Sequence, residues 1–252
     1  MKKVDKILNL ILPVLTIACI FLVWGITAKS VDNPFILPSV REVAISCGAL
    51  FKDKAFYLAL LKTLLSSLIA FLISFALAFL TAYLTKKSAK AEVILRPIIA
   101  IIRALPTVAV VLMLYLWTTS DIAPVVVTML VVYPTLYQNV KQALDTTDDY
   151  TLEMCKIFNV SKKDVLLKVQ LPLAAPDLLS AIGSGLSLNL KLMVAAEVLS
   201  STANCLGFML NQSKIYYEQA TLIALVVIVI AVGLIIDGAF NLLSKKAGKW
   251  KC

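Results

Sequence analysis

The sequence contains no histidine, which removes several kinds of active site before any motif is considered. Without imidazole there is no histidine general acid or base, no histidine metal ligand and no histidine-dependent nucleophilic triad. The chain also lacks the Gly-x4-Gly-Lys-Ser/Thr loop that binds the phosphates of ATP, so we do not expect it to hydrolyse ATP by itself. We therefore expect a non-catalytic protein with no cofactor and no metal site.

Cysteine is scarce, and no two cysteines have the spacing of a metal site or a redox pair. The five are Cys19, Cys47, Cys155, Cys205 and Cys252. They are the small apolar residues expected in spans and loops. A disulfide between Cys47 and Cys205 is conceivable, because both fall on the outer side in the topology below, but no sequence signal requires it.

Charged residues are also few, at 15% of the 252 residues, whereas 60% are hydrophobic and the mean hydropathy is +0.92. Apolar runs of about 20 residues or more separate the charged clusters, which is long enough to cross a hydrocarbon core about 30 Å thick. The pattern predicts an all-α integral membrane protein with one transmembrane domain over residues 1–252. Six spans are expected, at about 7–28, 57–84, 97–117, 122–142, 174–199 and 219–243. The first run lacks a small-x-small cleavage site, so we expect it to be retained.

The net charge of +9 is explained by where the basic residues lie. With the N-terminus inside, sixteen of the 24 Lys and Arg residues fall in cytosolic segments and five fall outside. This is the positive-inside bias of membrane proteins. It predicts a multi-pass membrane protein with both termini in the cytosol, in contact with lipid and with no nucleic-acid partner.

The segment from Lys29 to Ala55 is the main outer loop in this topology. Its Pro34 and Pro38 are turn signals. Ser39 with Glu42 three residues later fits a capping box, which predicts a short amphipathic helix on the membrane surface after Ser39.

The segment at about 143–173 is a polar insert of mixed charge in an otherwise hydrophobic chain. A first short helix is expected from near Asp148 to Phe158, with Asn159 in the left-handed conformation that ends a helix. Ser161 with Asp164 would start a second helix, which Pro172 would close. The insert is therefore expected to be a helix–turn–helix elbow outside the bilayer.

A few polar residues and prolines interrupt the predicted spans. Arg103 and Lys191 either extend to the headgroups or face a translocation pathway, which they would make attractive to anions. Pro106 and Pro134 each remove a helix hydrogen bond. At both positions a plain kink is a simpler interpretation than a break in the helix that lines the pathway. Glu197 and Asp237 lie near the ends of spans. The simpler interpretation is that each carboxylate is solvated at the membrane interface, and the other is that it transfers protons.

The insert resembles the cytosolic signature of permease subunits of binding-protein-dependent ABC importers: Glu-Ala-Ala, three residues, Gly, nine residues, Ile-x-Leu-Pro. Glu153 takes the position of the glutamate, Met154 and Cys155 those of the two alanines, and Asn159 that of the glycine. The closing Ile-x-Leu-Pro corresponds to Val169-Gln170-Leu171-Pro172. Three further segments resemble the nitrate/sulfonate/taurine-type subfamily of these type I importers: Phe35-Ile36-Leu37-Pro38-Ser39, Arg103-Ala104-Leu105-Pro106-Thr107-Val108-Ala109 and Lys191-Leu192-Met193-Val194-Ala195-Ala196-Glu197-Val198. The resemblance covers about residues 35–245.

The resemblance implies a coupling helix from Glu153 to Phe158 that docks on a separate ATPase subunit, present in two copies. It also implies a second permease subunit, expected to be an identical copy, and an extracytoplasmic solute-binding protein that meets the outer segments 33–42 and 201–218. The pathway candidates are Arg103, Pro106, Lys191 and Glu197. The subfamily implies a small polar solute similar to nitrate, a sulfonate, taurine or a thiamine precursor, and Arg103 with Lys191 favours an anion.

Two other functions remain open from the sequence. A self-sufficient proton-coupled secondary carrier would need a coupling-ion site at the membrane midplane, often at broken helices in paired halves, and no inverted repeat is visible. A membrane scaffold without transport activity is the other alternative.

Overall fold

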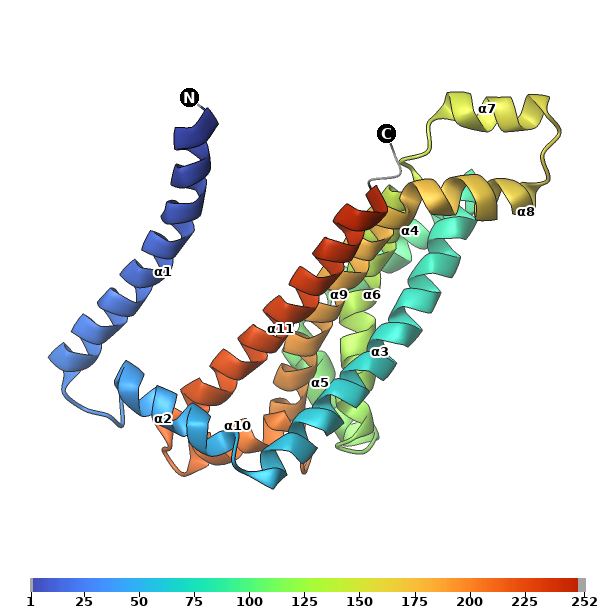
Figure 1. Ribbon diagram of the computed structural model, residues 1–252. Helices are drawn as coiled ribbons and strands as arrows, with labels where there is room; N and C mark the ends of the chain where they lie inside the picture. The colour runs from blue at the N-terminus through green and yellow to red at the C-terminus, as the bar shows by residue number, and fades with distance from the viewer. Residues whose placement is uncertain (1, 249–252) are drawn as a thin grey trace. The chain divides into compact units, whose positions relative to one another are not determined.

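The computed structural model describes residues 2–248, and all the regular structure in this part of the chain is helical (Figure 1). The α-helices are α1 (Lys2–Val31), α2 (Val40–Leu50), α3 (Lys54–Lys87), α4 (Ala89–Ala104), α5 (Thr107–Trp117), α6 (Ile122–Leu144), α7 (Asp149–Ile157), α8 (Lys162–Asp164), α9 (Leu171–Leu199), α10 (Leu206–Ile215) and α11 (Gln219–Gly248). A π-helical segment, η1 (Val165–Gln170), joins α8 to α9. The predicted all-α fold is confirmed.

The chain divides into two compact units, which are described separately. Unit 1 comprises Met1–Tyr57 and Met209–Ile228, and unit 2 comprises Leu58–Phe208 and Val229–Cys252. Residues 1 and 249–252, which the predicted domain over 1–252 includes, lie outside the described part of the chain.

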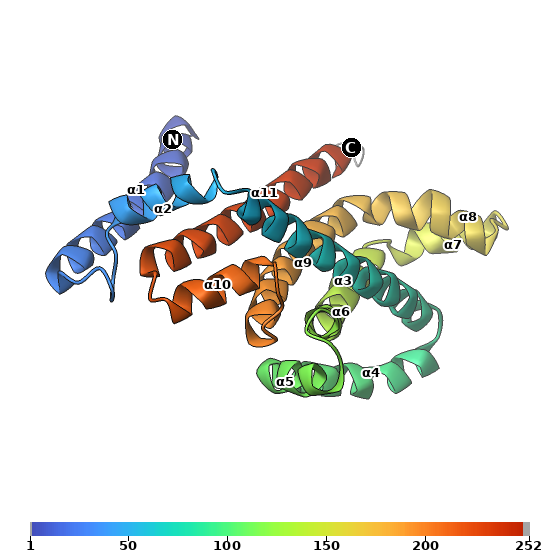
Figure 2. The ribbon, with the colours of Figure 1, turned by 90° about the horizontal axis from the view of Figure 1, so that it is seen from below.

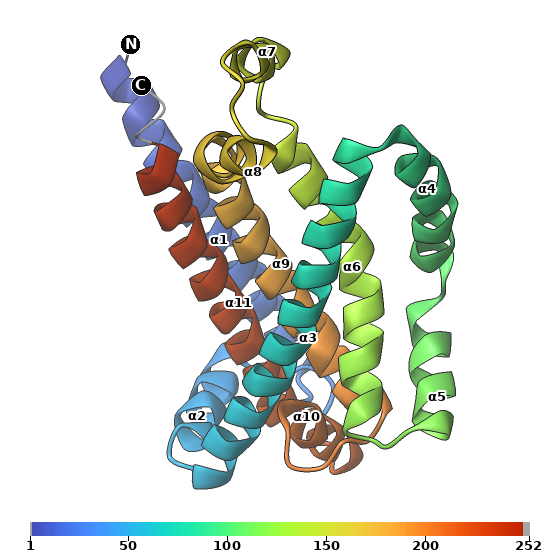
Figure 3. The same cartoon turned by 90° about the vertical axis from the view of Figure 1, so that its right-hand side faces the viewer.

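The core of unit 2 forms where α6 packs against α9, with α4 and α5 along another side of α6 (Figures 2 and 3). Buried side chains of α3, such as Phe71 and Ala78, join Leu136 and Val140 of α6 in one apolar cluster. Small residues allow close approach in such a bundle. Hydrogen bonds then fix the register: the Asn189 amide on α9 donates to the Ser67 carbonyl oxygen on α3 at 2.6 Å.

Unit 1 contains the predicted surface helix, and its start is confirmed. The Ser39 side chain accepts the backbone N–H of Glu42, and the Glu42 carboxylate accepts the N–H of Ser39 at 2.8 Å, so the capping box is complete. The Trp24 indole of α1 donates to the Pro38 carbonyl oxygen at 3.1 Å, which fixes the loop that leads into α2.

The predicted third span is broken rather than kinked. Helix α4 ends at Ala104, α5 begins at Thr107, and their axes differ by 89°. Leu105 takes an extended conformation (ψ 128°) because the following Pro106 disfavours the helical region there. The expectation of a plain kink at Pro106 was therefore wrong. By contrast, α6 runs without interruption through Pro134.

The second helix of the insert does not end at Pro172 as expected. The Leu171 N–H bonds to the carbonyl oxygen of Leu166, five residues back, and α8, η1 and α9 continue as one stretch from Lys162 to Leu199. Proline is tolerated in the first turn of α9, where its missing N–H leaves no gap in the regular hydrogen-bond ladder. The insert is thus one separate helix, α7, beside the N-terminal extension of α9.

Among the described residues, four helical stretches are long and apolar enough to cross a membrane, and the bent pair α4–α5 would make a fifth. The four are α3, α6, Lys162–Leu199 and α11. The predicted first span at 7–28 falls within α1, whose side chains are described only in part. The six span boundaries stay a prediction.

Candidate functional site

Helix α7 is defined at both ends by local side-chain chemistry. Asp148 is the N-cap, and its carboxylate accepts the backbone N–H of Thr151 at 3.1 Å. Hydrogen bonds from the side chain and then the backbone of Thr151 hold the pKa of Asp148 below its usual value. At the other end, Asn159 has a φ of 51°, so its predicted left-handed conformation is confirmed.

One face of α7 is apolar and open to solvent. Its residues are Tyr150, Met154, Ile157 and Phe158, spaced i, i+4, i+7 and i+8, and we call them the α7 face. Phe158 is 75% exposed and Met154 is 58% exposed. Figure 1 shows α7 as a separate helix beyond the ends of α3 and α6, joined to the rest of the chain by a loop on each side. A helix that leaves large apolar side chains in water is suited to dock on another protein.

The other side of α7 borders a pocket of about 670 Å³. Glu153, Cys155 and Asn159 line it, with Lys86 and Lys87 from the end of α3. The predicted coupling residues therefore divide between two sides of one helix: Met154 and Phe158 lie on the α7 face, and Glu153, Cys155 and Asn159 border the pocket. The closing positions lie elsewhere: Val169 in η1 and Leu171 at the start of α9 are half-buried, and Pro172 is exposed.

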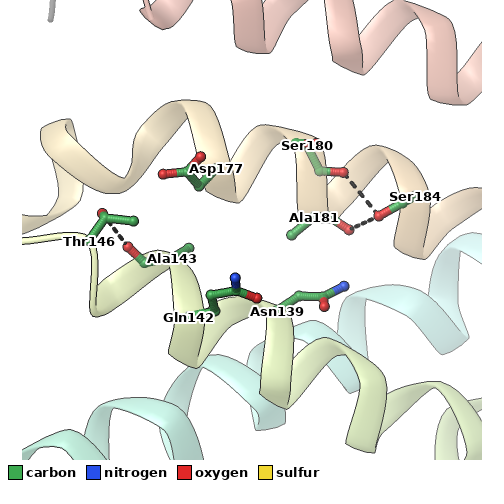
Figure 4. Close-up of a pocket in the computed structure, with 8 residues that line it drawn as sticks. All are labelled: Asn139, Gln142, Ala143, Thr146, Asp177, Ser180, Ala181 and Ser184. Atoms are coloured by element: carbon green, nitrogen blue, oxygen red, sulfur yellow. Dashed lines mark hydrogen bonds between the residues drawn. The ribbon is translucent and has the colours of Figure 1, made fainter.

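A second feature is a polar groove of about 320 Å³ between α6 and α9 (Figure 4). Its lining comprises Asn139, Gln142, Ala143 and Thr146 of the α6 end and Asp177, Ser180, Ala181 and Ser184 of α9. The Ser184 hydroxyl donates to the Ser180 carbonyl oxygen at 3.1 Å, whereas the amide side chains of α6 point toward α9. The groove offers hydroxyl and amide groups to a polar solute.

The groove was missed from the sequence, although a signal is present. The polar positions follow a spacing of i, i+3 and i+7 in both segments, at 139, 142 and 146, of which 146 lies just past the end of α6, and at 177, 180 and 184 within α9. This spacing places three polar side chains on one side of an apolar helix. Most of these side chains are uncharged amides and hydroxyls, which stand out less in an apolar helix than Arg103 or Lys191 does.

The predicted pathway residues are not gathered at this groove. Arg103 is exposed in the last turn of α4, and Pro106 is the N-cap of α5. Lys191 is exposed on α9. It lies on the same side of the helix as Ser184, which precedes it by seven residues. None of the three borders the polar groove.

Glu197 is not solvated at an interface, and that expectation was wrong. Its side chain is only 2% exposed at the end of α9. The carboxylate accepts the Thr63 hydroxyl at 2.9 Å and the Gly207 N–H at 3.1 Å. These donors satisfy a buried charge that would otherwise be costly. The contacts come from α3 and α10, which the sequence alone does not bring together.

Unit 1 has a groove of its own, of about 460 Å³. Phe35 and Glu42 line one part of it, and Tyr216 and Tyr217 line another. The aromatic rings of Phe35, Tyr216 and Tyr217 are largely exposed.

Among residues 2–248, no group of three His, Cys, Asp or Glu side chains is arranged to hold a metal ion. Cys47 and Cys205, the conceivable disulfide partners, are both free thiols.

Comparison with known proteins extends these observations. Residues 74–249 match the family described as binding-protein-dependent transport system inner membrane component. The chain is 25% identical over 165 residues to a Bacillus subtilis (strain 168) protein named for aliphatic sulfonate transport, the permease SsuC, and the match covers 65% of this chain and 59% of that protein. It is 20% identical over 242 residues to the taurine transport system permease protein TauC of Escherichia coli (strain K12), covering 93% and 88%.

Solved transporters share the fold. A chain of the MetNI methionine ABC transporter in an inward-facing conformation superposes with a TM-score of 0.67 at 18% identity, covering 75% of this chain and 94% of that one. A chain of an amino acid ABC transporter crystallised with histidines gives 0.65 at 18% identity, covering 76% and 94%. The family match spans more than half of the chain and includes α6, α7, α9 and α11. The protein therefore belongs to the family of binding-protein-dependent transport system inner membrane components.

Proposed function

We propose that this chain forms half of the solute pathway of an ATP-driven importer and receives the power stroke through α7. The observation that carries this proposal is the α7 face, because a free-standing helix with Met154 and Phe158 in water has no packing role within its own chain. Burial of such a side chain in a partner groove is worth about 1.5–3 kcal/mol. Two copies of a separate ATPase subunit, one for each permease, would supply these grooves.

The two sides of α7 support a division of roles. Met154 and Phe158 would enter the ATPase, whereas the smaller Cys155 lies toward the pocket beside α3. Met154, which departs from the alanine of the family signature, therefore adds contact area instead of hindering the fit. A flexible thioether side chain adapts well to an irregular groove.

The family match supports the rest of the proposed assembly, which lies in the bacterial plasma membrane. A second permease, an identical copy, would complete the pathway, with both termini in the cytosol and six spans in the plasma membrane. An extracytoplasmic binding protein would dock at the groove of unit 1, where Phe35, Tyr216 and Tyr217 present exposed rings beside Glu42. Exposed aromatic side chains are typical of protein interfaces.

The solute is proposed to be a small polar anion or an anion-bearing compound such as a sulfonate or taurine. The polar groove between α6 and α9 would provide hydrogen bonds on the cytosolic side of the pathway. Lys191, exposed on the same side of α9, would provide the positive charge. SsuC is named for the transport of aliphatic sulfonates and TauC for that of taurine, which supports this class of solute.

The α7 assignment is tested by removing one ring. Phe158→Ser should reduce recovery of the ATPase with the detergent-purified permease by about tenfold or more, the loss expected for one buried aromatic side chain. Phe35→Ser is the matched control, because Phe35 is 70% exposed but lies on the predicted outer side. Equal recovery with both variants would refute docking at the α7 face. Glu153→Lys should leave the permease in the membrane and abolish uptake.

The solute class is tested in two ways. Mass spectrometry of the purified binding protein should identify an anionic or anion-bearing ligand. Lys191→Glu should lower the uptake of that ligand more than it lowers the amount of folded permease, and an unchanged uptake rate would remove Lys191 from the pathway.

A further inference from the structure

The first turn of α10 is held almost entirely by side chains. Its first N–H, of Leu206, donates to the Thr63 hydroxyl oxygen at 3.0 Å, and its second, of Gly207, donates to the Glu197 carboxylate at 3.1 Å. The third, of Phe208, reaches the sulfur of Cys205 at 3.3 Å. The open N–H groups of a helix start are commonly satisfied by one local cap or by water. Here two of the three partners come from the distant helices α3 and α9.

Thr63 and Glu197 act as one unit in this contact. The Thr63 hydroxyl donates to the Glu197 carboxylate at 2.9 Å while it accepts the Leu206 N–H. Both side chains are buried, at 0% and 2% exposure. The carboxylate also lies at the N-terminal, electropositive end of α10, where a negative charge is favourable. Replacing either partner would leave a buried donor without an acceptor, which costs more than the bond itself contributes.

The approach of α10 to α9 is as close as the backbone allows. A Cβ added at Gly207 would overlap the Cβ of Glu197 and lie 2.7 Å from the backbone nitrogen of Val198. Only glycine permits this contact at position 207.

The loop between α9 and α10 is fixed in the same way. Lys62, beside Thr63 on α3, donates to the Ala203 carbonyl oxygen at 2.8 Å and pairs with Asp121 at 2.8 Å. Ser201 and Asn204 take left-handed conformations, with φ values of 52° and 55°, so the loop makes two sharp turns within a few residues. The start of α10 is therefore fixed by α3 and α9 together.

We propose that Glu197, with Thr63, is a positioning residue that seats the first turn of α10, and that docking of the solute-binding protein at Tyr216 and Tyr217, which directly follow α10 in the chain, depends on this seating. This inference rests on the proposed function, in which those tyrosines belong to the docking groove. It gives the Glu of the Lys-Leu-Met-Val-Ala-Ala-Glu segment a role in receiving the binding protein and removes it from the solute pathway.

The test uses Thr63, because a change there leaves the charges of the cluster intact. In a permease whose other four cysteines are serine, the rate of Cys205 alkylation by N-ethylmaleimide reports whether the start of α10 is seated. Thr63→Val should raise this rate about tenfold, as expected for the loss of a hydrogen bond to a charged group. Thr63→Ser keeps the hydroxyl and should stay at the original rate. Equal rates for the valine and serine variants would overturn the proposal.

A second measurement separates positioning from general stability. In vesicles that contain the complete transporter, the concentration of solute-loaded binding protein that half-maximally stimulates ATP hydrolysis should rise about tenfold in Thr63→Val, with the same maximal rate. Glu197→Gln, whose carbonyl oxygen can still accept both bonds, should retain most of the response. Asp237→Asn, a change of carboxylate elsewhere in an apolar helix, is the control.

The possible failures are distinguishable. If the unmodified transporter shows no stimulation by the binding protein, the proposed function fails, whatever the alkylation rates. If stimulation is normal in the unmodified protein and unchanged in Thr63→Val, the positioning role of Glu197 and Thr63 is wrong while the importer function stands.

Discussion

Gly183 of α9 faces Phe240 of α11 so closely that a Cβ on the glycine would lie 2.5 Å from the Cβ of the phenylalanine. The two helices therefore meet with almost no side chain between them at this point. Such contacts let transmembrane helices gain van der Waals packing where lipid offers no hydrophobic driving force.

Gly183→Ala should destabilise the bundle because the Cβ of Phe240 is fixed to its backbone and cannot move aside. Overpacking of this kind costs about 1–3 kcal/mol. The midpoint of thermal unfolding in detergent should fall accordingly. Gly238→Ala in α11 is the matched control, since nothing lies within 4 Å of its added Cβ, and alanine there should leave stability equal or higher. A lower midpoint for Gly238→Ala than for Gly183→Ala would contradict this account.

Asn159 is the second position where the backbone dictates the residue. Its φ of 51° is open to glycine and tolerated by asparagine, whereas a β-branched residue is strained there by about 1–2 kcal/mol. Asn159→Gly should therefore keep ATPase association, and Asn159→Val should weaken it by loosening the end of α7. Recovery of the ATPase with each purified variant checks both outcomes. A valine variant that binds as well as the glycine variant would show that the end of α7 is not fixed.

Much of the insert could be predicted from the sequence because its signals are local. Asp148, Asn159 and Ser161 act on backbone groups within three residues, and all three take the expected roles. The same holds for the capping box of Ser39 with Glu42.

The features that were missed depend on packing between distant segments. The burial of Glu197 needs Thr63, 134 residues earlier, and the polar groove needs α6 beside α9. The helix continues through Pro172 because of the hydrogen bond in η1 between residues five apart. No pattern of residue types in the sequence predicts that bond. At Pro106 the sequence located the interruption but not its size, because a proline in a predicted span does not by itself give the 89° angle between α4 and α5.

The cap of α7 predicts a pH dependence. Hydrogen bonds from Thr151 hold the pKa of Asp148 below its ordinary value of 3.8. A carboxyl group whose pKa is lower in the folded state stabilises it fully above the unfolded pKa and loses that contribution as the pH falls through the folded pKa. The amides of α7 should thus keep their protection at neutral pH and lose it only below about pH 4.

Hydrogen–deuterium exchange of residues 149–157, corrected for intrinsic rates, measures this loss. Asp148→Asn should remain protected over the whole range, because asparagine is an equally good N-cap and does not titrate there. Asp148→Ala should exchange faster already at pH 7. An acid-induced loss of protection in the asparagine variant that matches the original protein would assign the effect to another group.

The break at Pro106 gives the last prediction. Pro106 cannot donate a backbone hydrogen bond and keeps Leu105 extended, so α4 and α5 cannot join. Pro106→Ala removes both constraints, and Leu105 can then enter a helix that runs from α4 into α5. We expect the distance between spin labels at positions 98 and 112 to lengthen, because a right-angled pair is shorter end to end than a straight one. Uptake should fall if the break belongs to the pathway. Pro134→Ala in the uninterrupted α6 is the control and should change neither quantity. An unchanged label distance in Pro106→Ala would mean that packing on α6, and not the proline, maintains the bend.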